Sequence, residues 1–186
     1  MSEPFIRRAT ACDVALLSAL QAACFQPDGA AESAPGSQET GHVGEAWSLR
    51  SWAEVLAMPG SFALLAARPG RADNAEAHNA EAHNAEDEPI GFFLAQVLFA
   101  EGELLSFGVV PACRRCGYGR LLLAEGLAVA QRQGAERIQL EVAENNRRAQ
   151  NFYISSGFSL TGRRPGYYRL GNGRAVDALV LQKPLA

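Results

Sequence analysis

The stretch Val109–Leu123, VVPACRRCGYGRLLL, joins an apolar strand to an apolar helix through a turn rich in glycine and arginine. The strand is predicted over residues 103–110, ELLSFGVV, and Pro111 ends it because proline has no backbone N–H for a strand ladder. The helix is predicted over residues 119–134, GRLLLAEGLAVAQRQG, where apolar residues recur at helical spacing. The stretch therefore predicts a strand–turn–helix unit within a mixed α/β fold.

The turn itself has the composition of an anion-binding loop. Gly117 and Gly119 permit positive φ angles and a close approach of the backbone to a ligand. The first amides of the following helix have no partner inside the helix and lie at the positive end of its dipole, which suits a pyrophosphate. Arg114, Arg115 and Arg120 add positive charge. We therefore predict that the turn binds a phosphate group.

Two common phosphate-binding motifs do not match this turn. A P-loop requires Gly-Lys-Ser/Thr, whereas Gly119 is followed by Arg120 and Leu121. A dinucleotide fingerprint requires a third glycine at position 122, where this chain has leucine. Since a bare Gly-x-Gly is a weak pattern, the ligand has to be identified from a longer segment.

Cys113 and Cys116 form a C-x-x-C within the same turn. A zinc site needs about four ligands, and a redox pair of this kind usually begins a helix after a strand. The other candidate zinc ligands are Cys12, Cys24, His42, His78 and His83, none at a pair spacing that completes a zinc site. We interpret the two cysteines as incidental thiols and expect no metal, with a redox-active pair as the alternative.

Further segments on both sides of this unit read as regular elements. Apolar alternation or continuous apolar runs predict strands, and apolar residues at helical spacing predict helices. The predicted strands are 4–8, 61–67, 90–99, 137–142, 158–164 and 175–185, and the predicted helices are 13–25, 49–58 and 145–157.

Two segments lack a periodic apolar face and are predicted to be flexible loop insertions. Residues 26–46 are rich in Gly, Ser, Pro and Ala. Residues 68–89 contain a five-residue repeat, NAEAHNAEAHNAEDE, that places histidines at 78 and 83. A spacing of five does not put two side chains on one helical face, so a solvated low-complexity segment is favoured over a metal site.

Length and composition indicate one soluble domain over residues 1–186, since 48% of the residues are hydrophobic and 20% are charged. No apolar run is long enough for a transmembrane helix, and the N-terminal residues lack the apolar core of a signal peptide, so we expect a cytoplasmic protein. Residues 101–186 carry 12 basic and 7 acidic side chains. This balance suits a polyanionic small molecule better than nucleic acid, which usually requires a more basic domain.

The quoted stretch and a second one, LEVAENNRRAQNFYISSGF at residues 140–158, together resemble the two diagnostic segments of the GNAT family of N-acetyltransferases. Within the family, LEV, the later YY and the DA near the C-terminus look most like the ribosomal-protein-alanine N-acetyltransferases. The resemblance implies an α/β (α+β) fold: a mixed, mostly antiparallel central sheet flanked by helices, with a splayed strand pair holding acetyl-CoA. It is specific over residues 103–183 and fainter over 4–67.

The resemblance also assigns residues to the cofactor. Main-chain groups at the end of the strand, at Phe107, Gly108 and Val109, match those that bind the pantetheine arm in the family. Asn146 matches an asparagine that contacts the same arm. The turn matches the pyrophosphate loop, through Arg115, Cys116, Gly117, Tyr118, Gly119 and Arg120. Cys116 departs from the usual arginine or glycine, which main-chain recognition tolerates.

For catalysis, the resemblance implies that Glu141 is the general base for the acceptor amine. Tyr153 matches the tyrosine beside the cofactor sulfur and is expected to protonate the departing thiolate. The Val109 amide is expected to polarise the thioester carbonyl. Tyr167 and Tyr168 are expected to line the acceptor channel. Ordinary alternatives are a surface carboxylate for Glu141 and aromatic packing for the three tyrosines.

These residues predict an acyltransferase that moves an acetyl group from acetyl-CoA, without a metal, directly to a primary amine. The acceptor is expected to be a protein N-terminus, as in the alanine-modifying branch, or a small-molecule amine. A non-catalytic acyl-CoA-binding module is the alternative from another class, and retention of Glu141 and Tyr153 counts against it. We expect no nucleic-acid or membrane partner, and either a monomer or a homodimer.

Overall fold

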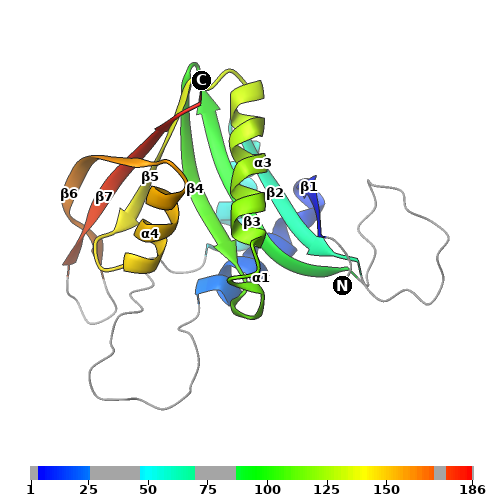
Figure 1. Cartoon of the computed structure of the whole chain (residues 1–186). Helices are drawn as coiled ribbons and strands as arrows, with labels where there is room; N and C mark the ends of the chain where they lie inside the picture. Colours follow the sequence, from blue (N-terminus) through cyan, green and yellow to red (C-terminus); the bar gives the residue numbers. More distant parts are fainter. Residues whose placement is uncertain (1–3, 26–46, 70–86, 170–174, 186) are drawn as a thin grey trace, which may run out of the picture.

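A computed structural model describes residues 4–25, 47–69, 87–169 and 175–185 of the chain (Figure 1). Its elements, in chain order, are β1 (Phe5–Arg8), a 3-10 turn (Ala11–Asp13), α1 (Val14–Phe25), α2 (Leu49–Ala57), β2 (Ser61–Arg68), β3 (Glu88–Leu98), β4 (Glu101–Val109), a second 3-10 turn (Pro111–Cys113), α3 (Tyr118–Arg132), β5 (Arg137–Ala143), α4 (Arg147–Ser155), β6 (Ser159–Arg169) and β7 (Ala175–Pro184).

The described strands form one seven-stranded sheet in the order β1-β2-β3-β4-β5-β7-β6. Every neighbouring pair is antiparallel except β4 and β5, which run parallel. The mixed, mostly antiparallel sheet flanked by helices that the sequence predicts is therefore confirmed.

The parallel pair opens along its length. Strands β4 and β5 are hydrogen-bonded only from Glu101 and Arg137 to Leu104 and Leu140. Beyond that point β4 continues towards Val109 without pairing to β5, which stays paired with β7 along its whole length, and Figure 1 shows β4 and β5 diverging with α4 beside them. The predicted splayed strand pair is present, and its opening faces the glycine turn that begins α3.

Helices cover both faces of the sheet. On one face α3 lies along β3 and β4 (Figure 1), and Gly126 permits the contact because a Cβ there would lie 2.4 Å from the Phe93 ring. On the other face, α1 and α2 pack against Phe92 through Leu17 and Trp52, all fully buried. Side-chain alternation along β3 supplies both layers, since successive residues point to opposite faces.

Several boundaries differ from those predicted. Strand β6 continues five residues beyond the predicted end, through Arg169, because antiparallel pairing with β7 overrides a segment, RPGYY, that reads as loop. Strand β3 begins at Glu88, so residues 68 and 88–89 of the predicted insertion belong to strands. Residues 70–86 of that insertion and the whole of the one at 26–46 lie outside the described residues. The single-domain organisation stays a prediction.

Within the described part of the chain, no helix is long and apolar enough to span a bilayer.

Candidate active site

The free stretch of β4 presents its main chain to the gap beside β5. The Val110 amide donates to the Ile90 carbonyl at 3.0 Å, so the backbone of Val110 faces β3. Because backbone groups alternate in direction along a strand, those of Val109 and Phe107 face the gap. Three residues are predicted to bind the pantetheine arm through main-chain groups. The main chain of two of them, Phe107 and Val109, faces the opening.

Gly108, the third of these residues, has a different role. Its backbone faces β3 by the same alternation, and it pairs in register with Phe92. A Cβ at Gly108 would lie 2.8 Å from Cβ of Cys24 and 2.9 Å from the Phe92 ring. Glycine is required here so that α1 can pack closely on the sheet, and the expected contact of Gly108 with the cofactor arm is not supported.

The turn before α3 has the form of an anion-binding loop. Amides of Arg120 and Leu121 make the first hydrogen bonds of the helix, to the Gly117 carbonyl at 3.0 and 3.2 Å. The amides of residues 117–119 thus have no partner inside the helix. Gly117 has φ of 87°, Arg115 has φ of 64°, and no described atom lies within 4 Å of the position that a Cβ on Gly117 would take. This open space beside free amides fits a phosphate group.

Side chains around the turn contribute unevenly. Tyr118 packs against the core and offers only its amide, whereas Arg120 and Cys116 are exposed. The guanidinium of Arg114, expected to add charge for a phosphate, instead donates to the carbonyls of Val109 at 3.0 Å and Cys24 at 2.7 Å. It ties the end of β4 to the end of α1, because both ends expose carbonyls that a planar donor can bridge.

The start of α4 forms the opposite wall of the gap. The side-chain oxygen of Asn146 accepts from the Ala149 amide at 3.1 Å and caps the helix, which leaves only its NH₂ group for the predicted cofactor contact. The neighbouring Asn145 has a buried side-chain oxygen with no hydrogen-bond partner among the described residues. An unpaired buried acceptor is costly, so this oxygen is a candidate contact that the sequence reasoning missed.

Tyr153 lies on α4 among aromatic rings. Its ring centroid is 6.3 Å from that of Phe107, 5.3 Å from Phe152 and 5.5 Å from Phe158. Burial raises the pKa of Tyr153 well above its usual range, with a smaller contribution from Tyr168. The phenol therefore keeps its proton at neutral pH, as a proton donor must, and it is packed against the gap-facing strand through Phe107.

Glu141 lies on β5 and points to the opposite face from Leu140 and Val142, which belong to the core beneath α3 and α4. Its side chain is 14% exposed and forms an ion pair with Arg164 of β6, Nε to Oε1, at 2.9 Å. The Arg164 guanidinium also lies over the Tyr167 ring, 5.5 Å from its centroid. The sequence reasoning missed Arg164. It is the last residue of the predicted strand, which continues to Arg169 in the structure, and no local pattern indicates that its side chain shares a face with Glu141.

The two tyrosines of β6 connect these groups. Tyr167 is hydrogen-bonded to Glu141, which together with burial raises the tyrosine pKa. Burial, then the charges of Glu141 and Tyr167, raises the pKa of Tyr168 to about 12. Because Tyr168 interacts electrostatically with both Glu141 and Tyr153, the structure brings the predicted base, the predicted acid and the predicted channel residues into one neighbourhood.

An irregularity in β6 aims these side chains. The pairing of β6 with β7 shifts register between Arg164 and Tyr168, where Gly166 has φ of 62°. Asp177 of β7 holds this bulge by accepting from the Gly166 amide at 2.7 Å and from Arg163 Nε at 2.7 Å. Bulges commonly re-aim side chains beside active sites, and this one carries Tyr167, whereas Arg163 and Arg164 precede it and point to opposite faces by ordinary alternation.

A buried polar network fixes the other side of the gap. Gln21 of α1 donates to the Ser106 hydroxyl of β4 at 3.1 Å. Its oxygen accepts from the Trp47 amide at 2.7 Å and from the Trp52 indole at 3.1 Å. The network thus fastens the segment entering α2 to the strand that borders the gap, and sequence spacing alone does not reveal it.

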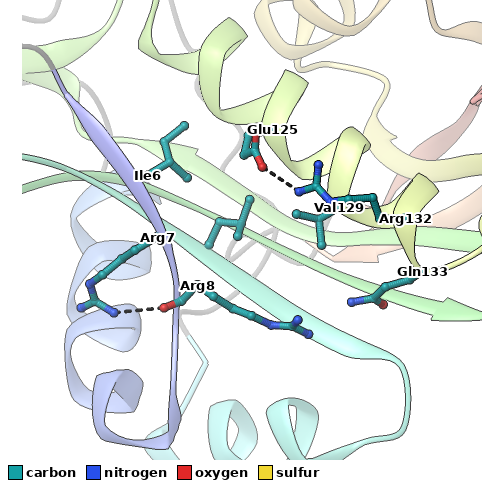
Figure 2. A pocket seen from close by; sticks show the side chains of 8 residues that line it. Ile6, Arg7, Arg8, Glu125, Val129, Arg132 and Gln133 are labelled. Carbon is teal, nitrogen blue, oxygen red and sulfur yellow. Dashed lines mark hydrogen bonds and ion pairs between the residues drawn. The ribbon is translucent and has the colours of Figure 1, made fainter. Parts of the chain in front are cut away.

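A separate hollow of about 300 Å³ lies between β1 and the C-terminal half of α3 (Figure 2). It contains the ion pair of Glu125 and Arg132, 2.8 Å apart. Since α3 begins at the glycine turn and the hollow is lined from Glu125 to Arg132, it lies roughly 10–20 Å along the helix from the turn. None of the predicted site residues lines it.

The cysteines of the turn are unlike each other. Cys113 is buried in the core, and burial raises its pKa, whereas the Cys116 thiol is exposed and contacts the Arg114 carbonyl at 3.5 Å. Among the described residues, no three His, Cys, Asp or Glu side chains gather as a metal site would require. The predicted candidates His42, His78 and His83 lie outside the described residues.

Comparisons with known proteins agree with this geometry. The Acetyltransferase (GNAT) family pattern matches residues 46–158. A [Ribosomal protein bS18]-alanine N-acetyltransferase of Haemophilus ducreyi is 32% identical over 96 residues, which cover 52% of this chain and 66% of that relative, just under two thirds of its length.

Solved structures share the fold. The ribosomal-protein-S18-alanine N-acetyltransferase of Escherichia coli superposes with a TM-score of 0.72 at 20% identity, covering 99% of this chain and 95% of that one. YncA of Salmonella typhimurium, solved with acetyl-CoA, gives 0.66 at 18% identity, covering 100% and 95%. The GNAT-like fold predicted from the sequence is therefore confirmed.

Proposed function

The chain belongs to the GNAT family of acetyltransferases, and we propose that it is an acetyl-CoA-dependent N-acetyltransferase that moves an acetyl group directly to a primary amine. One observation carries the proposal. The opening between β4 and β5 has the glycine turn at one end, main chain of β4 that is not paired with β5 along one side, and a buried tyrosine and a carboxylate beside it. These are the groups that acetyl transfer from a thioester requires.

The residues present fit acetyl-CoA. Free amides of residues 117–119 hold the pyrophosphate, in the space that Gly117 leaves open. Main-chain groups of Phe107 and Val109, with the amide nitrogen of Asn146, hold the pantetheine arm. The buried, unpaired oxygen of Asn145 gains a donor when an amide of that arm lies in the gap. When bound, the cofactor supplies the activated acetyl group.

Three groups of the chain then act on protons and charge. Glu141 accepts the proton of the acceptor ammonium, directly or through a water, because the ammonium has no lone pair for attack. The Val109 amide stabilises negative charge on the acetyl oxygen. Tyr153, whose pKa burial raises, is protonated at neutral pH and gives its proton to the departing thiolate.

We propose a protein N-terminal α-amine as the acceptor. Two facts support this choice: the similarity to an enzyme named for a ribosomal-protein alanine, and the pair Tyr167 and Tyr168 on the exposed strand β6, next to Glu141. Aromatic side chains with polar tips suit an extended peptide entering from this side. A cytoplasmic location, where ribosomal proteins are made, is part of the same proposal.

The experiment is an acceptor panel followed by release of free thiol from acetyl-CoA. The panel contains a peptide with a free N-terminal alanine, the same peptide acetylated at its N-terminus, an N-terminally blocked peptide with one lysine, and small amines such as a polyamine and an amino sugar. We expect turnover with the free alanine peptide alone. Turnover confined to the small amines contradicts the acceptor, and no turnover with any amine contradicts the enzyme.

A further inference from the structure

The predicted base is already paired with a positive charge. Arg164 Nε lies 2.9 Å from a carboxylate oxygen of Glu141, in the place where the ammonium of an acceptor has to come for Glu141 to take its proton. A carboxylate and a guanidinium within this distance form a charge-assisted contact. An acceptor ammonium that is to contact this carboxylate oxygen directly therefore has to displace Arg164.

The pair is asymmetric in its exposure. The side chain of Glu141 is 14% exposed and that of Arg164 is 53% exposed. A mostly buried carboxylate without a cationic partner is costly, whereas a half-exposed guanidinium is readily rehydrated when it moves out. The carboxylate therefore needs a cation at all times, and the guanidinium is the one that can leave.

The position of Arg164 is stabilised by contacts besides its ion pair with Glu141. Its guanidinium lies over the Tyr167 ring, and Tyr167 is itself hydrogen-bonded to Glu141. Arg164 pairs in regular register with Ala178 of β7, and the bulge that follows it, which carries Tyr167, is fixed by the contacts of Asp177 with Gly166 and Arg163. Arg163 is used in that support and in an ion pair with Glu144, so among the described residues Arg164 is the cation that pairs with Glu141.

We propose that Arg164 is a positioning and specificity-determining residue that occupies the site of the acceptor ammonium and is displaced by it. It keeps the Glu141 carboxylate oriented in the empty channel and admits only acceptors that bring a positive charge of their own. The inference rests on the proposed function, because it assumes an amine that must reach Glu141. It identifies the bound form of the acceptor as a protonated primary amine.

The test replaces Arg164 and measures the acceptor KM. Arg164→Gln removes the competing charge, and Arg164→Met removes it while keeping a long side chain over Tyr167. Both variants should lower the KM of the free N-terminal peptide by about two- to fivefold, the worth of a partly exposed ion pair, with kcat little changed. Arg164→Lys keeps a cation and should stay close to the unmodified enzyme. Loss of a merely structural residue raises KM or lowers kcat, and would not give this direction.

Two controls isolate the charge. Arg169→Gln removes an exposed arginine of the same strand that makes no ion pair with another described residue, and it should leave KM unchanged. The N-terminally acetylated peptide is a neutral competitor, and its inhibition constant should not respond to Arg164→Gln. A competitor that binds more tightly as well would mean that the channel has merely widened, which overturns the inference.

Calorimetry with CoA present gives a readout independent of turnover. Arg164→Gln should tighten binding of the free peptide in the otherwise unmodified protein but not in a Glu141→Gln background, where no ion pair exists to break. Unchanged or weaker peptide binding after Arg164→Gln, in a protein that still acetylates peptides, overturns the inference and leaves the proposed function intact. Absence of acetylation with every amine removes the proposed function itself.

Discussion

The two ends of the gap between β4 and β5 differ in the groups that line them, which are backbone groups at one end and side chains at the other. At the end near α3, the proposed recognition groups are backbone amides of residues 117–119 and the main chain of Phe107 and Val109. At the end near β6, they are side chains: Glu141, Arg164 and the two tyrosines of β6. From this difference we predict which kind of substitution impairs each end. We expect the backbone end to tolerate a change of side-chain chemistry but not of shape. We expect the side-chain end to lose activity when the chemistry changes, even where the shape is kept.

The largest expected effect is at the side-chain end. Glu141→Gln keeps the shape and removes the base, and Tyr153→Phe keeps the ring and removes the proton donor. Each should lower kcat by about 10²–10⁴-fold, the usual contribution of a general acid or base, while acetyl-CoA affinity changes little. Steady-state kinetics and calorimetric titration with acetyl-CoA separate the two quantities. Full activity in both variants would remove the assigned roles.

The pH dependence of the Glu141→Gln variant sharpens this prediction. The loss should shrink as pH rises, because a neutral amine no longer needs the base. A peptide α-amine becomes neutral near pH 8, whereas a lysine side chain requires about 10.4. Recovery of rate near pH 8 thus indicates an α-amine acceptor, and recovery only near pH 10 contradicts it.

The next largest effect is at the backbone end. Gly117→Val forces a β-branched side chain into a φ of 87° and into the space left for phosphate. A non-glycine residue in such a conformation costs about 1–3 kcal/mol, and the lost contacts add to it, so we expect acetyl-CoA affinity to fall by roughly 100-fold. Calorimetry checks the affinity, and circular dichroism checks that the fold persists. Unchanged affinity would show that the turn does not hold the pyrophosphate.

A third substitution affects the packing of α1 against β4, the strand that borders the gap. Gly108→Ala places a methyl group 2.8 Å from Cβ of Cys24 and pushes α1 away from β4. Overpacking of this kind costs typically about 1–3 kcal/mol of folding stability, so thermal unfolding should shift to lower temperature. Gly119→Ala is the matched control, since its Cβ would meet the Phe152 ring at an ordinary 3.5 Å. Equal stability of the two variants would contradict the packing role of Gly108.

The smallest effect on activity is expected when a side chain of the turn is changed in chemistry but not in size. Cys116→Ser exchanges one exposed, small polar group for another, and the amides of the turn are untouched. Activity should stay within about threefold, because the main chain makes the phosphate contacts. Cys113→Ser buries a hydroxyl and should lower stability by about 1–3 kcal/mol. A large loss of acetyl-CoA affinity in Cys116→Ser would assign the thiol a direct part in the loop.

Sequence reasoning predicted the strand–turn–helix unit at the backbone end, because the signals for it are local. The glycines, the proline that ends β4 and the apolar spacing of α3 lie within one continuous stretch, Val109–Leu123. The resemblance also led to Glu141 and Tyr153, and the structure places both beside the gap. It did not anticipate the structural contacts that some of these residues make. Arg114 bridges two backbone carbonyls, Gly108 permits close packing of α1, and the Asn146 side-chain oxygen caps α4.

By itself, the sequence determined the order of strands and helices, the anion-binding turn and the chemical types available for acetyl transfer, since periodicity and short-range motifs are properties of neighbouring residues. Only the tertiary structure decided which of these groups meet. Arg164 reaches Glu141 because β6 pairs with β7 and β7 pairs with β5. In this register Gly162 is aligned with Glu141 through Val180, and Arg164, two residues further along β6, lies on the same face. Such contacts join residues far apart in the chain, and their geometry depends on sheet register and packing that no local pattern encodes.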